Sequence, residues 1–168
     1  FRQVIGEGYY FVDRSEHIHT LEEMGKQLLF LRPRRFGKSL LLSMLENYYD
    51  VARAGEFEQL FGRLAIGQNP TPLHSQYLVM RWDFSVVDPQ GSPEQVKQAL
   101  HNHINNAVKA FVLWYRDYLP DAIDINPDDA IASFEAVLPV VKKYGHRFYL
   151  LIDEYDNFAN EVLMGSGP

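Results

Sequence analysis

Cysteine is absent from the 168 residues of this chain. Its absence excludes disulfide bonds, thiol nucleophiles and zinc sites built on cysteine, and is compatible with the cytoplasmic location that we expect. The sequence also lacks an apolar run near the about 20 residues that a membrane helix requires, and it lacks a signal peptide at its start. We therefore expect neither a disulfide-stapled domain nor a membrane partner.

An excess of positive charge is also missing. The formal net charge is −6, so the surface as a whole does not attract nucleic acid, and nucleic acid is not indicated as a partner. The composition, 46% hydrophobic and 23% charged, is that of an ordinary globular protein. Its length suits one domain with a buried core, and the 14% of aromatic residues indicates a solid core or a buried interface.

Apolar segments typical of strands alternate with segments of helical periodicity. Strands are predicted at residues 9–14, 27–31, 77–84 and 148–152. Helices are predicted after Ser15, from Lys38, over residues 56–61, from Ser92 to near Pro120, and from Asn126 to Gly145, with a kink at Pro139. Ser15 and Ser92 are predicted to cap the helices that they precede, and Pro93 to occupy the first turn after Ser92. Because the strands are nearly all apolar, the expected fold is α/β, with a mostly parallel sheet flanked by helices.

Residues 32–39 resemble a Walker A loop, the phosphate-binding motif G-x-x-x-x-G-K-[ST]. Backbone N–H groups near Gly37 and at the following helix N-terminus point toward phosphate oxygens. The charge of Lys38 acts on the outer phosphates, and the hydroxyl of Ser39 is a ligand for Mg²⁺. Arg32 stands in place of the first glycine, which changes the conformation expected at the entrance of the loop. The nucleotide-binding residues predicted here are Arg34, Arg35, Phe36, Gly37, Lys38, Ser39 and Leu40.

The tripeptide Gly-Lys-Ser is weak evidence by itself, since it arises by chance in roughly one chain in ten of this length. The plain alternative is a solvated basic turn that opens a helix. Two features favour the phosphate loop: its position between an apolar strand and a helix, and a second motif downstream.

That second motif, residues 148–154, is a Walker B pattern, an apolar strand that ends in two carboxylates. Asp153 is predicted to hold Mg²⁺ together with Ser39, and Glu154 to act as the catalytic residue that polarises the attacking water, beside Lys38. Together the motifs predict ATP and Mg²⁺ as ligands.

Other polar residues are interpreted more plainly. The basic cluster of residues 32–38 could contact a nucleic-acid backbone, but inside a phosphate loop it more simply faces the triphosphate. Histidines spaced two apart, at 17 and 19 and at 101 and 103, make poor metal sites on a helix. Asp83 is interpreted as a structural hydrogen-bond acceptor for a loop, and Asp156 as a cap of the next helix rather than part of the metal site.

Several strings along the chain resemble the bacterial AAA-ATPase-like family, P-loop ATPase domains often followed by a nuclease-like domain of the PD-(D/E)XK type. The strings are Tyr10-Phe11-Val12-Asp13-Arg14, residues 30–40 with Arg-Pro-Arg-Arg-Phe-Gly-Lys-Ser, Trp82-Asp83-Phe84-Ser85, and residues 150–156. The family itself shows arginine at the first Walker A position. The resemblance implies a P-loop ATPase with the roles given above for Lys38, Ser39, Asp153 and Glu154, and a nuclease-like domain as partner in the full-length protein.

In such ATPases further strands follow Walker B, so residues 1–168 are expected to be the N-terminal part of the domain, with residues 1–27 as a lead-in. We expect such a part to hydrolyse little ATP alone and to self-associate or rely on another chain. The expected function is ATP binding with Mg²⁺-dependent hydrolysis that drives a conformational change in a larger protein. The alternatives are a switch or scaffold that binds ATP with negligible turnover and, less favoured, a phosphotransferase. No guanine-reading Asn-Lys-x-Asp motif is present, which favours adenine.

Overall fold

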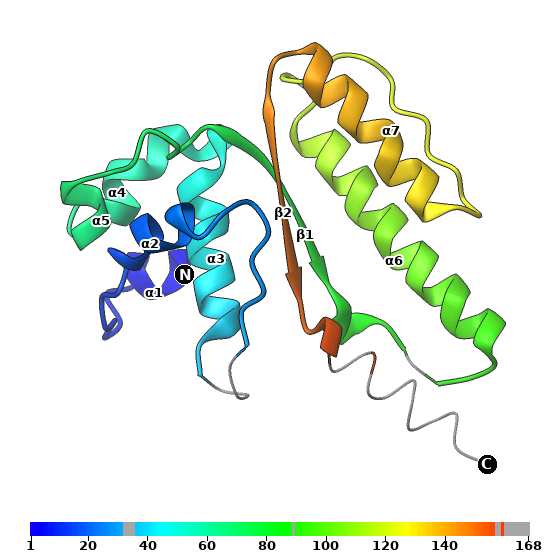
Figure 1. The fold of residues 1–168 in the computed structure, drawn as a ribbon, viewed down its shortest axis with the longest axis horizontal. Helices are drawn as coiled ribbons and strands as arrows, with labels where there is room; N and C mark the ends of the chain where they lie inside the picture. The colour runs from blue at the N-terminus through cyan, green and yellow to red at the C-terminus, as the bar shows by residue number, and fades with distance from the viewer. Residues whose placement is uncertain (32–35, 89, 157–158, 160–168) are drawn as a thin grey trace. The chain divides into compact units, whose positions relative to one another are not determined.

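The computed structural model describes residues 1–31, 36–88, 90–156 and 159 (Figure 1). The chain divides into two compact units, one of residues 1–77 and one of residues 78–168. Each unit has its own elements and its own core, and each carries a different part of the predicted site. Arg34 and Arg35, which were predicted to bind phosphate, lie outside the described residues.

The first unit is built from short helices. They are α1 (Arg2–Gly6), α2 (His17–Glu23), α3 (Lys38–Tyr49), the 3₁₀ helix η1 (Val51–Glu56), α4 (Phe57–Phe61) and α5 (Ala65–Gln68). The predicted helices that start at Lys38 and end at Phe61 are confirmed. Tyr48 and Phe61 are fully buried, and their rings pack edge-to-face with centroids 5.4 Å apart. This geometry contributes stability in addition to that from the apolar area the rings bury. This aromatic core packs α3 against α4.

Two predicted strands in this unit are wrong. Residues 9–14 and 27–31 are described throughout, and neither segment forms a strand. Leu29 and Leu31 are 68% and 71% exposed, which is the opposite of the predicted burial inside a sheet. An apolar segment forms a strand only where a second backbone lies alongside it, and no strand accompanies these residues in the part of the chain that the structure describes.

The predicted role of Ser15 as a helix cap is also wrong. Helix α2 begins at His17 without a side-chain cap, while Ser15 is fully buried and its Oγ accepts a hydrogen bond from the N–H of Ile66 at 3.1 Å. Asp13 acts beside it: Oδ2 accepts from the N–H of Ala65 at 2.7 Å, and Oδ1 from the N–H of Ser15 at 2.9 Å. Both side chains therefore hold the start of α5, about fifty residues away in sequence.

Replacing Asp13 with asparagine is expected to destabilise the first unit by about 1 kcal/mol at pH 7, because the amide offers one acceptor oxygen for the two N–H groups. Burial raises the pKa of Asp13, but the hydrogen bonds from Ser15 and Ala65 outweigh it and hold the pKa below its ordinary value of 3.8. Because the pKa of Asp13 is lower in the folded state, its ionised carboxylate stabilises the fold above pH 3.8. This stabilisation is lost as the pH falls through the folded-state pKa.

Denaturant unfolding of wild type and Asp13→Asn at several pH values measures this effect. The stability difference should be full at pH 7 and should shrink below about pH 4. Asp124→Asn, at an exposed aspartate, serves as the matched control and should leave the unfolding free energy unchanged. A stability difference between wild type and Asp13→Asn that stays constant down to pH 3 would contradict the assignment.

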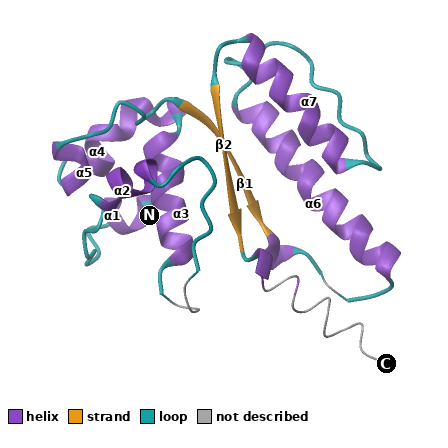
Figure 2. Ribbon diagram, viewed as in Figure 1, coloured by secondary structure: helices purple, strands orange, loops and turns teal. Residues whose placement is uncertain are grey.

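The second unit contains the sheet. Its elements are β1 (Tyr77–Asp83), the 3₁₀ helix η2 (Phe84–Val86), α6 (Pro93–Trp114), α7 (Ala130–Lys143) and β2 (Arg147–Asp153). The strands β1 and β2 pair and run in the same direction (Figure 2). The predicted strands at 77–84 and 148–152 and the α/β class are confirmed. Within the described residues the sheet has these two strands, which is smaller than the sheet that was expected.

Local sequence signals explain the helices of this unit. The Oγ of Ser92 accepts from the N–H of Gln95, whose side chain accepts from the N–H of Ser92, and Pro93 occupies the first turn, as predicted. Helix α6 ends at Trp114, earlier than predicted. Helix α7 is capped by Asp129 and contains Pro139 in its interior. No helix in the described ranges is long and apolar enough to cross a membrane.

Helices α6 and α7 lie side by side and pack on the strands (Figure 1). The ring of Phe148 on β2 packs against two other rings. Its centroid lies 5.6 Å from that of Phe111 on α6 and 5.8 Å from that of Phe134 on α7. The N–H of Val79 donates to the hydroxyl of the buried Tyr115 at 2.9 Å, which ties β1 to the residue that ends α6. Since the strands are parallel, this packing holds the carboxyl ends of β1 and β2 at one edge of the sheet.

Candidate functional site

The first part of the candidate site is the N-terminus of α3. Gly37 is the N-cap residue, with φ +80° and ψ 18°, a left-handed conformation that glycine adopts without strain. No side chain caps this end of the helix, and its first turn contains no acidic residue. A helix N-terminus without a carboxylate presents N–H groups and a partial positive charge, which are the features that bind phosphate.

Lys38, Ser39 and Leu40 form the first turn of α3, as predicted for a phosphate loop. Ser39 is exposed, while Lys38 and Leu40 are half-buried. Phe36, just before the cap, is 64% exposed.

The second part of the candidate site is the carboxyl edge of the sheet in residues 78–168. Asp153, the last residue of β2, is 3% exposed, and its Oδ2 lies 2.9 Å from Nη2 of Arg81 on β1. The same Nη2 lies 3.8 Å from Oδ2 of Asp83, the last residue of β1. Three charged side chains from neighbouring strands therefore meet where the strands end, with Arg81 between two carboxylates.

Glu154, the predicted water-activating residue, has an unusual backbone. Its φ is +55°, in the left-handed region that non-glycine residues rarely adopt, and its N–H donates to Oδ1 of Asp153 at 3.1 Å. Such a conformation costs on the order of 1 kcal/mol and is common at functional sites. Asp156, which was predicted to cap the next helix, is itself helical.

Arg81 is the functional candidate that the sequence analysis missed. It is the one charged residue between Tyr77 and Trp82 in a strand whose other residues are largely buried. An arginine in that setting is seldom tolerated without a carboxylate partner, so its position was a usable signal for a buried acid. Spacing along the chain does not indicate that the acid is Asp153, 72 residues away.

Asp83 and the histidines have the structural contacts that such residues usually make. Oδ1 of Asp83 accepts from the N–H and the Oγ of Ser85 and so caps η2, rather than bonding to a loop as predicted. His103 packs against Phe84, and burial lowers its pKa although Asp83 opposes this, so the ring is neutral at pH 7. His101 Nδ1 accepts from the N–H of Ala130 at 3.2 Å.

Ser39 and Asp153, which were predicted to hold Mg²⁺, each carry an oxygen donor and lie in different units. This ion prefers oxygen ligands and is usually held by one or two carboxylates, with waters and substrate phosphates completing its shell. Across residues 1–31, 36–88 and 90–156, no three histidine, aspartate or glutamate side chains gather as an all-protein metal site would need.

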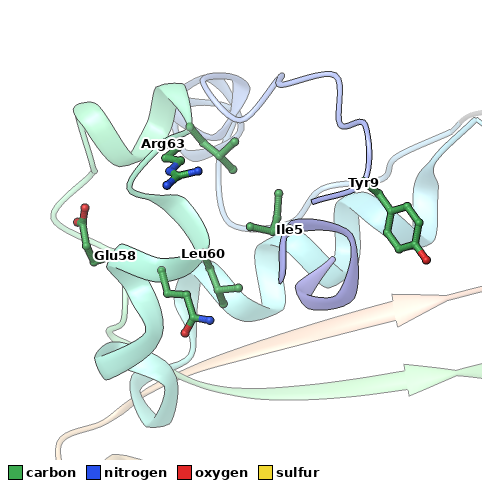
Figure 3. A pocket seen from close by; sticks show the side chains of 7 residues that line it. Ile5, Tyr9, Glu58, Leu60 and Arg63 are labelled. Carbon is green, nitrogen blue, oxygen red and sulfur yellow. The ribbon is translucent and has the colours of Figure 1, made fainter. Parts of the chain in front are cut away.

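A separate pocket of about 640 Å³ lies in the first unit, between α1, the loop after it and α4 (Figure 3). Ile5 and Leu60 give it apolar walls, Tyr9 closes one side, and Glu58 and Arg63 place opposite charges on it. None of the predicted site residues lines this pocket.

The model of a family described as predicted AAA-ATPase matches residues 1–166, nearly the whole chain. No curated protein and no solved structure matches the chain.

Proposed function

The chain belongs to the family of predicted AAA-ATPases, and on this premise we propose that it binds ATP with Mg²⁺ and hydrolyses it. We further propose that hydrolysis drives a conformational change in a larger protein. The observation that carries the proposal is the N-terminus of α3, which has a left-handed glycine as its cap, no capping side chain, and Lys38 and Ser39 in its first turn.

Each residue has a distinct role in the proposal. The first turn of α3 binds phosphate oxygens, and Lys38 supplies a point charge toward the outer phosphates. Ser39 and Asp153 hold Mg²⁺, which neutralises charge on the phosphates when it is bound. Glu154 accepts a hydrogen bond from the attacking water and orients it.

A switch that binds ATP with negligible turnover is the second candidate, and a specific observation favours it. Both carboxylate oxygens of Asp153 are engaged inside the chain, Oδ2 by Arg81 and Oδ1 by the N–H of Glu154. An aspartate held in this way is less available to a metal ion, which would limit turnover while leaving phosphate binding at α3 unaffected.

Equilibrium titration with a fluorescent ATP analogue tests the proposed function. We expect saturable binding in Mg²⁺, weaker binding in EDTA, and displacement by ATP in preference to GTP. Asp153→Asn should reduce the affinity for Mg²⁺ in the ATP complex by about tenfold or more, because a charged metal ligand is lost.

Asp124→Asn, an exposed aspartate of the same unit, is the matched control for the charge change and should bind as wild type does. Absence of saturable binding would overturn the proposal. Binding that is insensitive to both Mg²⁺ and Asp153→Asn would remove Asp153 from it.

A further inference from the structure

We propose that Arg81 is a positioning residue for Glu154 and that it acts through the carboxylate of Asp153. Arg81 holds this carboxylate, and the carboxylate in turn holds the backbone of Glu154 in the left-handed conformation that directs its side chain. The inference deepens the proposed function and rests on it in one respect, that Glu154 is taken as the residue that orients the attacking water.

The backbone of Glu154 determines where its carboxylate lies. Residue 153 ends β2 and residues 155 and 156 are helical, so Glu154 alone turns the chain from strand to helix. Glu154 is half-buried, and within the described part of the chain its side chain makes no hydrogen bond or ion pair that would fix it. A change of φ at this residue would therefore swing the carboxylate away from its place beside the end of β2.

The left-handed conformation of Glu154 needs support. At φ +55° a residue with a Cβ is disfavoured about tenfold relative to right-handed backbone, because the Cβ crowds a carbonyl oxygen. The N–H of Glu154 donates to Oδ1 of Asp153 at 3.1 Å. A charged acceptor makes a stronger hydrogen bond than a neutral one, so this bond offsets the strain as long as Asp153 stays ionised and keeps its orientation.

Arg81 supplies both conditions. Asp153 is 3% exposed, and a buried carboxylate keeps its charge only with a positive partner. Nη2 of Arg81 lies 2.9 Å from Oδ2 of Asp153, which leaves Oδ1 to accept from the N–H of Glu154. The two oxygens of Asp153 therefore have separate partners, and together they connect β1 to the backbone of Glu154.

The guanidinium of Arg81 has a further support on its own strand. Oδ2 of Asp83 lies 3.8 Å from the same Nη2, and Oδ1 of Asp83 accepts from the N–H and the Oγ of Ser85. A side chain that lies between two carboxylates loses much of its rotamer freedom, as a group that orients a neighbouring residue requires.

The ordinary alternative is a structural ion pair that only joins β1 to β2. The two interpretations differ in what the loss of Arg81 changes. A structural pair lowers the unfolding free energy when it is broken and leaves φ of Glu154 as it is. A positioning arginine, when it is removed, releases Glu154 from the left-handed region in a chain that is still folded.

The nuclear Overhauser effect between HN and Hα of Glu154, measured in the isotope-labelled chain, separates the two. These protons are closest in a left-handed residue, so the signal should be strong in the wild type. It should stay strong in Arg81→Lys, which keeps the positive charge, and should fall to the level of right-handed residues in Arg81→Met, which has neither charge nor donor. Arg147→Met, at the exposed first residue of β2, is the control and should match the wild type. A weak signal in the wild type, or a strong one in Arg81→Met, would overturn the proposal.

Asp153→Ala covers the case in which Arg81→Met does not fold. It removes the acceptor of the Glu154 N–H, while Arg81 keeps Asp83 as a carboxylate partner. The strong signal of Glu154 should be lost here as well. If it persists, Asp153 does not hold the backbone of Glu154 and the proposal is wrong.

Kinetics of the full-length protein give a second readout that a structural pair would not produce. Arg81→Met should lower kcat for ATP hydrolysis about tenfold with KM for ATP unchanged, and Arg81→Lys should restore most of the loss. A raised KM with unchanged kcat would contradict the positioning role. A wild type without hydrolysis would count against the proposed function alone, because the signal of Glu154 is measured without nucleotide.

Discussion

Replacing Lys38 with alanine is expected to weaken ATP binding about ten- to hundredfold, the loss that follows when a charged hydrogen bond is removed. Lys38 is the first residue of α3 and is half-buried, so its ammonium group starts from the helix end that attracts phosphate. The helix itself should persist, because alanine is the best helix former.

Titration with the fluorescent ATP analogue measures this change, and circular dichroism verifies that helix content is kept. Lys26→Ala is the matched control, since Lys26 is an exposed lysine in the same unit, outside any helix. Its affinity for ATP should equal that of the wild type. Equal affinities for wild type and Lys38→Ala would show that the N-terminus of α3 is not the phosphate site.

In the full-length protein, replacing Glu154 with glutamine is expected to slow ATP hydrolysis about 100-fold or more while ATP binding is retained, because only activation of the attacking water is lost. Glutamine keeps the length of the side chain and a comparable preference at φ +55°, so the backbone is perturbed little. Glycine would relieve the backbone strain and is less suitable for this test.

Phosphate release under saturating ATP measures the hydrolysis rate, and the binding titration measures affinity in parallel. Asp156→Asn is the control: it removes one negative charge two residues away and should leave turnover unchanged. Wild-type turnover in Glu154→Gln would assign Glu154 no part in hydrolysis. If the wild type itself hydrolyses ATP as slowly as Glu154→Gln does, the switch that binds ATP with negligible turnover would be favoured.

Elements with local signals were predicted from the sequence. Ser92 and Pro93 indicate the start of α6, and the apolar periodicity of the helix continues to Trp114. The strands β1 and β2 were predicted from short apolar runs, and each has a neighbouring strand to pair with. In these segments local propensity and tertiary packing favour the same structure.

Elements that depend on distant residues were not predicted. Residues 27–31 have the composition of a buried strand but no strand beside them, and Ser15 binds Ile66 rather than the helix that follows it. A single sequence does not record which distant backbone will be available, so propensity alone gave the wrong structure at both places.

The candidate site divides in the same way. Its two motifs were found because each is a contiguous string, and the residues of Lys38–Leu40 and Asp153–Glu154 remain predictions for nucleotide and metal binding. The pairing of Arg81 with Asp153 joins two strands through 72 residues of chain and could not be inferred from spacing. The left-handed backbone of Glu154 was equally hidden, because nothing in its side chain favours that conformation.

The contacts of Asp13 and Ser15 with α5 have a consequence for synthesis on the ribosome. In a nascent chain, residues 13 and 15 are synthesised before residues 65 and 66. Until those residues have been added, the carboxylate of Asp13 and the hydroxyl of Ser15 lack the N–H groups that they bind in the folded unit. During translation Asp13 and Ser15 therefore reach their final contacts only after residues 65 and 66 have been added, about fifty residues later.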